Sequence, residues 1–177
     1  MNMNQPINQL AAMPDDSEGE KNLQGQPAGR LLLLNGPNLN MLGRRDPKQY
    51  GTFTLADVEA LVLETAVRYS YAVDCFQSNH EGDLIDRIHD AIGRHQGILI
   101  NAGALTHTSY ALRDAIELCG LPVMEVHISD IHKREPFRRI SVIHDVCCGQ
   151  IAGFGLDSYR LAVEQLCHLL KGNQSHA

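Results

Sequence analysis

The chain has 177 residues, of which 44% are hydrophobic and 20% charged, a composition that predicts one folded domain. Its net charge of -6 and its pI near 5.8 argue against a nucleic-acid groove, and no apolar run approaches the roughly 18 residues that cross a bilayer. Five cysteines without CxxC spacing favour reduced thiols in a cytoplasmic protein over a disulfide framework or a zinc site.

Residues 1–29 differ in composition from the remainder of the chain. They are rich in Gln, Asn, Gly and Pro, carry an acidic cluster from Asp15 to Glu20, and contain no arginine. This composition predicts a disordered tail and fits neither a secretory signal nor an organellar transit peptide. We expect residues 30–172 to form the single catalytic domain, and catalysis not to need the tail.

From residue 31 onward, short apolar runs alternate with amphipathic stretches, which indicates repeated strand-then-helix units. The first strand is expected at 31–35, and Thr54 with Asp57 forms a capping box that opens a helix at 55–69. Further strands are expected at 72–77, 97–101, 123–128 and 147–153, with helices at 83–95, 109–118 and 156–170. Five such strands predict an α/β fold, a flavodoxin-like three-layer sandwich with a parallel sheet in the order 2-1-3-4-5.

Polar residues follow three of the predicted strands, where open parallel sheets bind ligands at their carboxyl ends. The set is rich in amides and cations and has no obvious nucleophilic serine or cysteine, which suits an anionic substrate and proton transfer. No GxGxxG or Walker A sequence follows a strand, so a bound nucleotide is disfavoured. The residues are Asn38, Arg45 and Tyr50 after the first strand; Asn101, Gly103, Thr106 and His107 after the third; and Glu125, His127, Ser129, Arg134 and Arg138 in and after the fourth.

Tyr50 is a candidate base. A phenol of ordinary pKa near 10 is about 0.1% ionised at neutral pH, but a neighbouring guanidinium favours the phenolate. Arg45, five residues earlier in the same loop, is placed to do this. The alternative is that Tyr50 only packs beside Pro47 in a lid.

Glu125 and His127 lie two positions apart in a strand, so they point to the same side and can form a carboxylate-imidazole pair. A histidine held in this way suits a general acid, and the alternative is a histidine satisfied in the core. A metal site of Glu125, His127 and His132 is less favoured because the spacing is not HExxH. Asn38 and Asn101 either form turns or orient water and hydroxyls.

Three segments carry a resemblance to a known family, in the family's order and spacing. They are LNGPNLNMLGRRDPKQYG at 34–51, INAGALTHTSYALRDA at 100–115 and PVMEVHISDIHKREPFR at 122–138. From about residue 30 to residue 170 the chain resembles the type II 3-dehydroquinate dehydratases. The resemblance implies a flavodoxin-like fold and the dehydration of 3-dehydroquinate to 3-dehydroshikimate in the shikimate pathway. It implies no metal or organic cofactor, a cytoplasmic location, and a homododecamer built as a tetramer of trimers.

The resemblance also implies roles for individual residues. Tyr50 would remove the proton from C2, and Arg45 would lower its pKa and stabilise the enolate. His127 would protonate the departing C1 hydroxyl, with Glu125 orienting it and Asn38 holding a water against the enolate oxygen. The implied substrate contacts are Asn101, His107, Ser129, Arg138, the backbone of Ile128 beside Ser129, and Asp114, which reaches toward a neighbouring subunit's site.

Other functions stay open at this point. The same reaction can serve quinate catabolism, and a flavodoxin-like binding module or a non-catalytic scaffold would use the same fold. Asp46 stands where glutamate is common in the family, and His144 and the pair Cys147 and Cys148 match no functional role.

Overall fold

The computed structural model describes residues 27–44 and 51–174. Arg45, Tyr50 and residues 1–26 of the predicted tail lie outside these ranges. Gly29, the last residue assigned to the tail, opens the first strand.

Five parallel strands form one sheet in the order β2-β1-β3-β4-β5, which confirms the predicted topology. Each strand begins and ends within two residues of the range expected from the sequence. The strands are β1 (Gly29–Asn35), β2 (Tyr71–Gln77), β3 (Gly97–Asn101), β4 (Val123–His127) and β5 (Gly149–Ala152).

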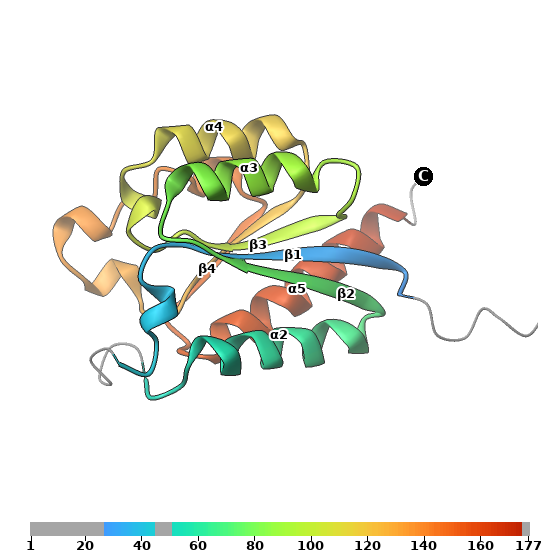
Figure 1. Cartoon of the computed structure of the whole chain (residues 1–177), viewed down its shortest axis with the longest axis horizontal. Coiled ribbons are helices and arrows are strands. Elements are labelled where there is room, and N and C mark those ends of the chain that lie inside the picture. Colours follow the sequence, from blue (N-terminus) through green and yellow to red (C-terminus); the bar gives the residue numbers. More distant parts are fainter. Residues whose placement is uncertain (1–26, 45–50, 175–177) are drawn as a thin grey trace, which may run out of the picture.

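Four described helices cover the sheet, with α2 and α5 on one face and α3 and α4 on the other (Figure 1). None of these helices is long and apolar enough to cross a membrane. They are α2 (Leu55–Arg68), α3 (Glu81–Ala91), α4 (Tyr110–Cys119) and α5 (Asp157–Gln174).

Two helix ends show how local chemistry sets the boundaries. The predicted capping box is present, because the Thr54 hydroxyl accepts from the Asp57 N–H and the Asp57 carboxylate accepts from the Thr54 N–H at 2.7 Å. The prediction for α3 was wrong at its end, since the helix stops at Ala91 and not at residue 95. Gly93 follows with a φ of 74°, a left-handed conformation that a helix cannot continue through.

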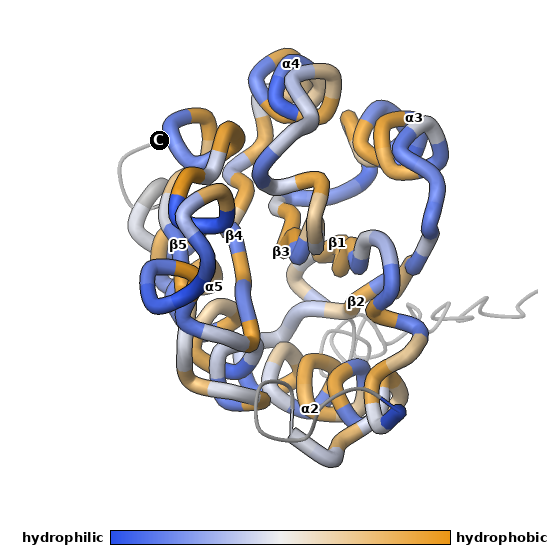
Figure 2. The backbone as a smooth tube through the Cα atoms, turned by 90° about the vertical axis from the view of Figure 1, so that its left-hand side faces the viewer, coloured by the Kyte–Doolittle hydropathy of each residue, from blue (hydrophilic) through white to orange (hydrophobic). Residues whose placement is uncertain are grey.

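The core has two layers because side chains alternate across β1. Leu31 and Leu33 pack on the α2 and α5 side, and Leu32 and Leu34 pack on the α3 and α4 side. Figure 2 shows these hydrophobic strands lying between the helices. The alternation continues to Asn35, which ends the strand as a polar side chain on the α2 and α5 side.

Candidate active site

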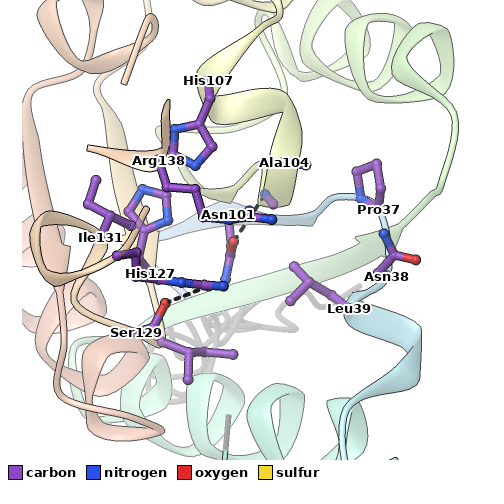
Figure 3. A pocket seen from close by; sticks show the side chains of 13 residues that line it. Pro37, Asn38, Leu39, Asn101, Ala104, His107, His127, Ser129, Ile131 and Arg138 are labelled. Carbon is purple, nitrogen blue, oxygen red and sulfur yellow. Dashed lines mark hydrogen bonds between the residues drawn. The ribbon is translucent and has the colours of Figure 1, made fainter. Parts of the chain in front are cut away.

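A pocket of about 100 Å³ opens beyond the carboxyl ends of β1, β3 and β4, as expected for a parallel sheet (Figure 3). Eight of the polar residues predicted for the site line it, drawn from all three predicted groups, and Ile128 joins them. Its lining consists of Pro37, Asn38, Leu39, Asn101, Gly103, Ala104, His107, His127, Ile128, Ser129, Ile131, Arg134 and Arg138.

Two glycines bring the loops after β1 and β3 into contact. A Cβ on Gly36 would lie 2.6 Å from the carbonyl oxygen of Ala102, and a Cβ on Gly103 would lie 2.9 Å from that of Pro37. Only glycine allows backbones to approach so closely. The contact places Asn38, whose own backbone is left-handed with a φ of 67°, opposite the residues of β4.

Glu125 and His127 form the predicted pair, at the end of β4. The imidazole Nε2 lies 2.6 Å from Oε1 of Glu125, and both residues are buried. Burial alone would raise the pKa of the Glu125 carboxyl, but the hydrogen bond with His127, its charge and the Ser141 hydroxyl outweigh burial, so the pKa lies below its ordinary value. Since Nε2 is used by the carboxylate, Nδ1 of His127 is the nitrogen left for a ligand.

Two residues that sequence reasoning had not assigned surround the Glu125 carboxylate. The hydroxyl of Ser141 donates to Oε1 at 2.8 Å, and Nδ1 of His144 lies 3.5 Å from Oε2. Both residues lie in the irregular segment between β4 and β5, where no periodic pattern marks which side chains turn inward.

His107 presents its imidazole to the pocket in a fixed orientation. Its Nδ1 lies 2.7 Å from the carbonyl oxygen of Ile140, to which Nδ1–H donates, so Nε2 remains as an acceptor. Burial lowers the pKa of His107, and the charges of His127 and Arg138 lower it further, while the Ile140 carbonyl opposes them. A neutral imidazole of this kind accepts a hydrogen bond from a hydroxyl.

Two arginines give the pocket its positive charge. The side chains of Arg134 and Arg138 are only 14% and 26% exposed, so these two arginines do not form a solvated basic face. Glu135 lies between them, with Oε2 3.5 Å from Nε of Arg134 and 3.3 Å from Nε of Arg138. Arg134 also donates to the Ser129 hydroxyl at 3.4 Å. These guanidinium groups suit a carboxylate ligand.

Asn101 is anchored from beneath by a tyrosine that the sequence had not singled out. Its Nδ2 donates to the Tyr159 hydroxyl at 2.8 Å, and that hydroxyl donates to Oδ1 of Asn35 at 2.8 Å. The Gly103 N–H donates to Oδ1 of Asn101 at 3.2 Å. Tyr159 lies in the first turn of α5, where the sequence indicates only a core-facing position.

Other described residues of the predicted set fall outside the pocket. Asp114 is exposed on α4 and does not line it. His132 lines a separate cavity, and the described part of the chain holds no cluster of three or more His, Cys, Asp or Glu side chains suited to a metal ion.

The assembled groups define the chemistry that the pocket can perform. A buried carboxylate holds an imidazole that can deliver a proton, amides and a neutral histidine can bind hydroxyls, and two guanidinium groups can bind an anion. No described side chain in the lining is an activated nucleophile. The pocket therefore fits acid-base chemistry on a small, hydroxylated anion.

Comparison with known proteins agrees with this chemistry. The family model described as Dehydroquinase class II matches residues 29–167. A 3-dehydroquinate dehydratase of Nostoc sp. is 56% identical over 142 residues, which cover 80% of this chain and 97% of that protein. A protein of Aspergillus flavus named catabolic 3-dehydroquinase 2 is 54% identical, over 80% of this chain and 95% of its own.

A solved structure shares the fold. The type II dehydroquinase from Butyrivibrio crossotus superposes with a TM-score of 0.76 and 44% sequence identity, covering 78% of this chain and 97% of its own. The sequence match, the shared fold and the strand order agree along most of the chain. The chain therefore belongs to the class II dehydroquinase family.

Proposed function

We propose that this chain dehydrates 3-dehydroquinate to 3-dehydroshikimate by anti elimination through an enolate, as a type II 3-dehydroquinate dehydratase. Its family makes it a hydro-lyase, and the relatives that match most of its length carry the name of that activity. The observation that carries the proposal is the buried 2.6 Å bond between Glu125 and His127, placed where a cation-lined pocket opens.

In the proposed first step, the phenolate of Tyr50 removes a proton from C2 and an enolate forms at the neighbouring carbonyl. Arg45 would favour the phenolate and stabilise the negative charge that develops. Both residues lie outside the described ranges, so their roles are supported by the resemblance of segment 34–51. A water held by Asn38 would donate to the enolate oxygen.

In the proposed second step, the enolate collapses, the bond from C1 to its hydroxyl breaks, and His127 protonates that hydroxyl as it leaves as water. The carboxylate of Glu125 orients the imidazole and stabilises its charged form. Anti elimination requires base and acid on opposite faces of the substrate ring. Asn38, which belongs to the same sequence segment 34–51 as Tyr50, and His127, at the end of β4, lie on opposite sides of the pocket, which supports this arrangement.

The proposed substrate contacts follow the chemistry of the pocket. Arg138, with Ser129 and the backbone of Ile128, would bind the carboxylate, and Asn101 and His107 would bind hydroxyls. Asp114 would act on the site of a neighbouring subunit in a dodecamer built as a tetramer of trimers. Its exposure on α4 supports a contact with another chain over one within its own.

We place the reaction in the shikimate pathway of aromatic biosynthesis, in the cytoplasm. The Nostoc and other bacterial relatives are named for the reaction alone, and the Aspergillus flavus relative is named for catabolism, so the assignment is supported by the resemblance stated from the sequence. Induction of the gene by quinate would contradict the biosynthetic role.

The test is a spectrophotometric assay with 3-dehydroquinate that follows the absorbance of the conjugated enone product. We expect wild type to turn over and Tyr50→Phe to lose nearly all activity, because a benzene ring cannot accept the C2 proton. Tyr69→Phe is the matched control, since it removes the same hydroxyl at the far end of α2 and is expected to keep the wild-type rate.

Two outcomes would contradict the proposal. Full activity of Tyr50→Phe would show that another group is the base. Inactivation by borohydride in the presence of substrate would indicate a lysine Schiff base, which the enolate route does not form.

A further inference from the structure

We propose that Tyr159 is a positioning residue for the reaction, acting through Asn101. Its hydroxyl joins Asn101, which lines the pocket, to Asn35, which does not. The inference rests on the proposed function, because it assigns Asn101 a contact with the substrate.

The fold brings these three side chains together for a simple geometric reason. Asn35 and Asn101 are register partners at the carboxyl ends of β1 and β3. Alternation places both on the side of the sheet that Leu33 and Leu99 share with α5. Tyr159 belongs to the same layer, so its hydroxyl meets the two amides from beneath the pocket.

The direction of the hydrogen bonds fixes the Asn101 amide. A phenol has one proton, and Tyr159 donates it to Oδ1 of Asn35 at 2.8 Å, so the hydroxyl must accept from Asn101. The nitrogen of the Asn101 amide is thereby held toward Tyr159, and Oδ1 accepts the longer bond of 3.2 Å from Gly103. The second Nδ2 proton remains for a ligand oxygen.

Burial prevents water from replacing the Tyr159 hydroxyl between Asn101 and Asn35. Tyr159 and Asn35 are 0% exposed and Asn101 is 4% exposed, so water does not reach the hydroxyl to substitute for it. Burial also raises the pKa of the Tyr159 phenol well above its ordinary value, which keeps it protonated. The hydroxyl is therefore suited to orienting an amide and unsuited to proton transfer.

The first test is Tyr159→Phe, which keeps the ring and removes only the hydroxyl. We expect KM for 3-dehydroquinate to rise about tenfold while kcat changes by less than about threefold, because a freed amide weakens ground-state and transition-state binding together. Tyr71→Phe is the matched control, since Tyr71 is also buried but begins β2 at the opposite end of the sheet. It is expected to keep the wild-type KM.

A double-mutant cycle separates positioning from a merely structural role. If Tyr159 acts through Asn101, Tyr159→Phe raises KM in the wild-type background and adds nothing in an Asn101→Ala background. An unchanged KM in the single variant, or an equal rise in both backgrounds, would overturn the inference. If Tyr159→Phe does not fold, Asn35→Ala takes its place in the cycle with the same expectation.

The failure of this inference is distinguishable from the failure of the proposed function. Absence of turnover in the wild type would contradict the function. A crystal structure of Tyr159→Phe would then test, without any assay, whether the Tyr159 hydroxyl orients Asn101. We expect the Asn101 amide to be rotated or to occupy more than one conformation. An Asn101 amide unchanged in that structure would overturn the inference.

Discussion

At the residue scale, the pocket depends on a carboxylate that is fully buried and still ionised. Glu125 tolerates burial because His127 and Ser141 both bond to Oε1, at 2.6 and 2.8 Å. A buried carboxylate without such partners would take up a proton. The Glu125 carboxylate thus orients the His127 imidazole, the proposed acid, and places a negative charge next to it.

The ionised state of Glu125 makes a contribution to stability that depends on pH. Its folded pKa lies below the ordinary 4.5, so this contribution is present above pH 4.5 and is lost as the pH falls through the folded pKa. We expect Glu125→Gln to be about 1–3 kcal/mol less stable than wild type at pH 5.5, with the difference shrinking toward pH 3. Urea unfolding at both pH values measures it, and a difference independent of pH would contradict the expectation.

The sequence predicted the hydrogen-bonded pair whose members lie close along the chain, but not the pairs whose members are far apart in sequence. Glu125 and His127 share a strand, so their separation of two residues predicts their contact. Ser141 reaches Glu125 from 16 residues away, and Tyr159 reaches Asn101 from 58 residues away. Such partners depend on the path of irregular segments and on helix docking, which periodicity does not encode.

At the element scale, the two loops above β1 and β3 position the pocket because their backbones touch. Gly36 faces the Ala102 carbonyl with no room for a side chain. The loop that carries Asn38 can approach the loop that follows Asn101 only while both contact positions, Gly36 and Gly103, remain glycine. Element boundaries were predictable where a cap or an apolar run marks them, and less so for α3, whose end is set by the backbone of Gly93.

We expect Gly36→Ala to lower the free energy of unfolding by about 1–3 kcal/mol, because the added methyl would overlap backbone atoms that cannot rotate away. Activity is expected to fall as well, since the loops must separate. Gly82→Ala, in the first turn of α3, is the control: its Cβ meets no atom within 4 Å, and we expect it to be neutral or stabilising by up to about 1 kcal/mol. Thermal and urea unfolding of both variants check the contrast.

At the scale of the whole molecule, the strand order was predictable because short buried strands alternating with helices leave few topologies. The oligomeric assembly could not be predicted in this way, since the periodicity of one chain does not show which of its surfaces contact other subunits. Large apolar side chains are exposed in the segment between β4 and β5, among them Phe137 and Ile140. Exposed apolar patches often mark interfaces.

We expect sedimentation to give a mass twelve times the 19.6 kDa of one chain. In that assembly Asp114→Asn is expected to raise KM about tenfold by removing a charge from the neighbouring site. A monomeric protein with full activity, or an Asp114→Asn variant with wild-type KM, would contradict this arrangement.

The turn at Gly93 has a practical consequence. It precedes β3, so it lies at the amino-terminal edge of the sheet, opposite the pocket, and a Cβ added to it would meet no atom within 4 Å. A peptide tag or a surface-coupling sequence inserted directly after it would leave the substrate entrance of its own subunit unobstructed. The same insertion after Gly36 would wedge two backbones apart, so the two glycines mark where this scaffold can and cannot be extended.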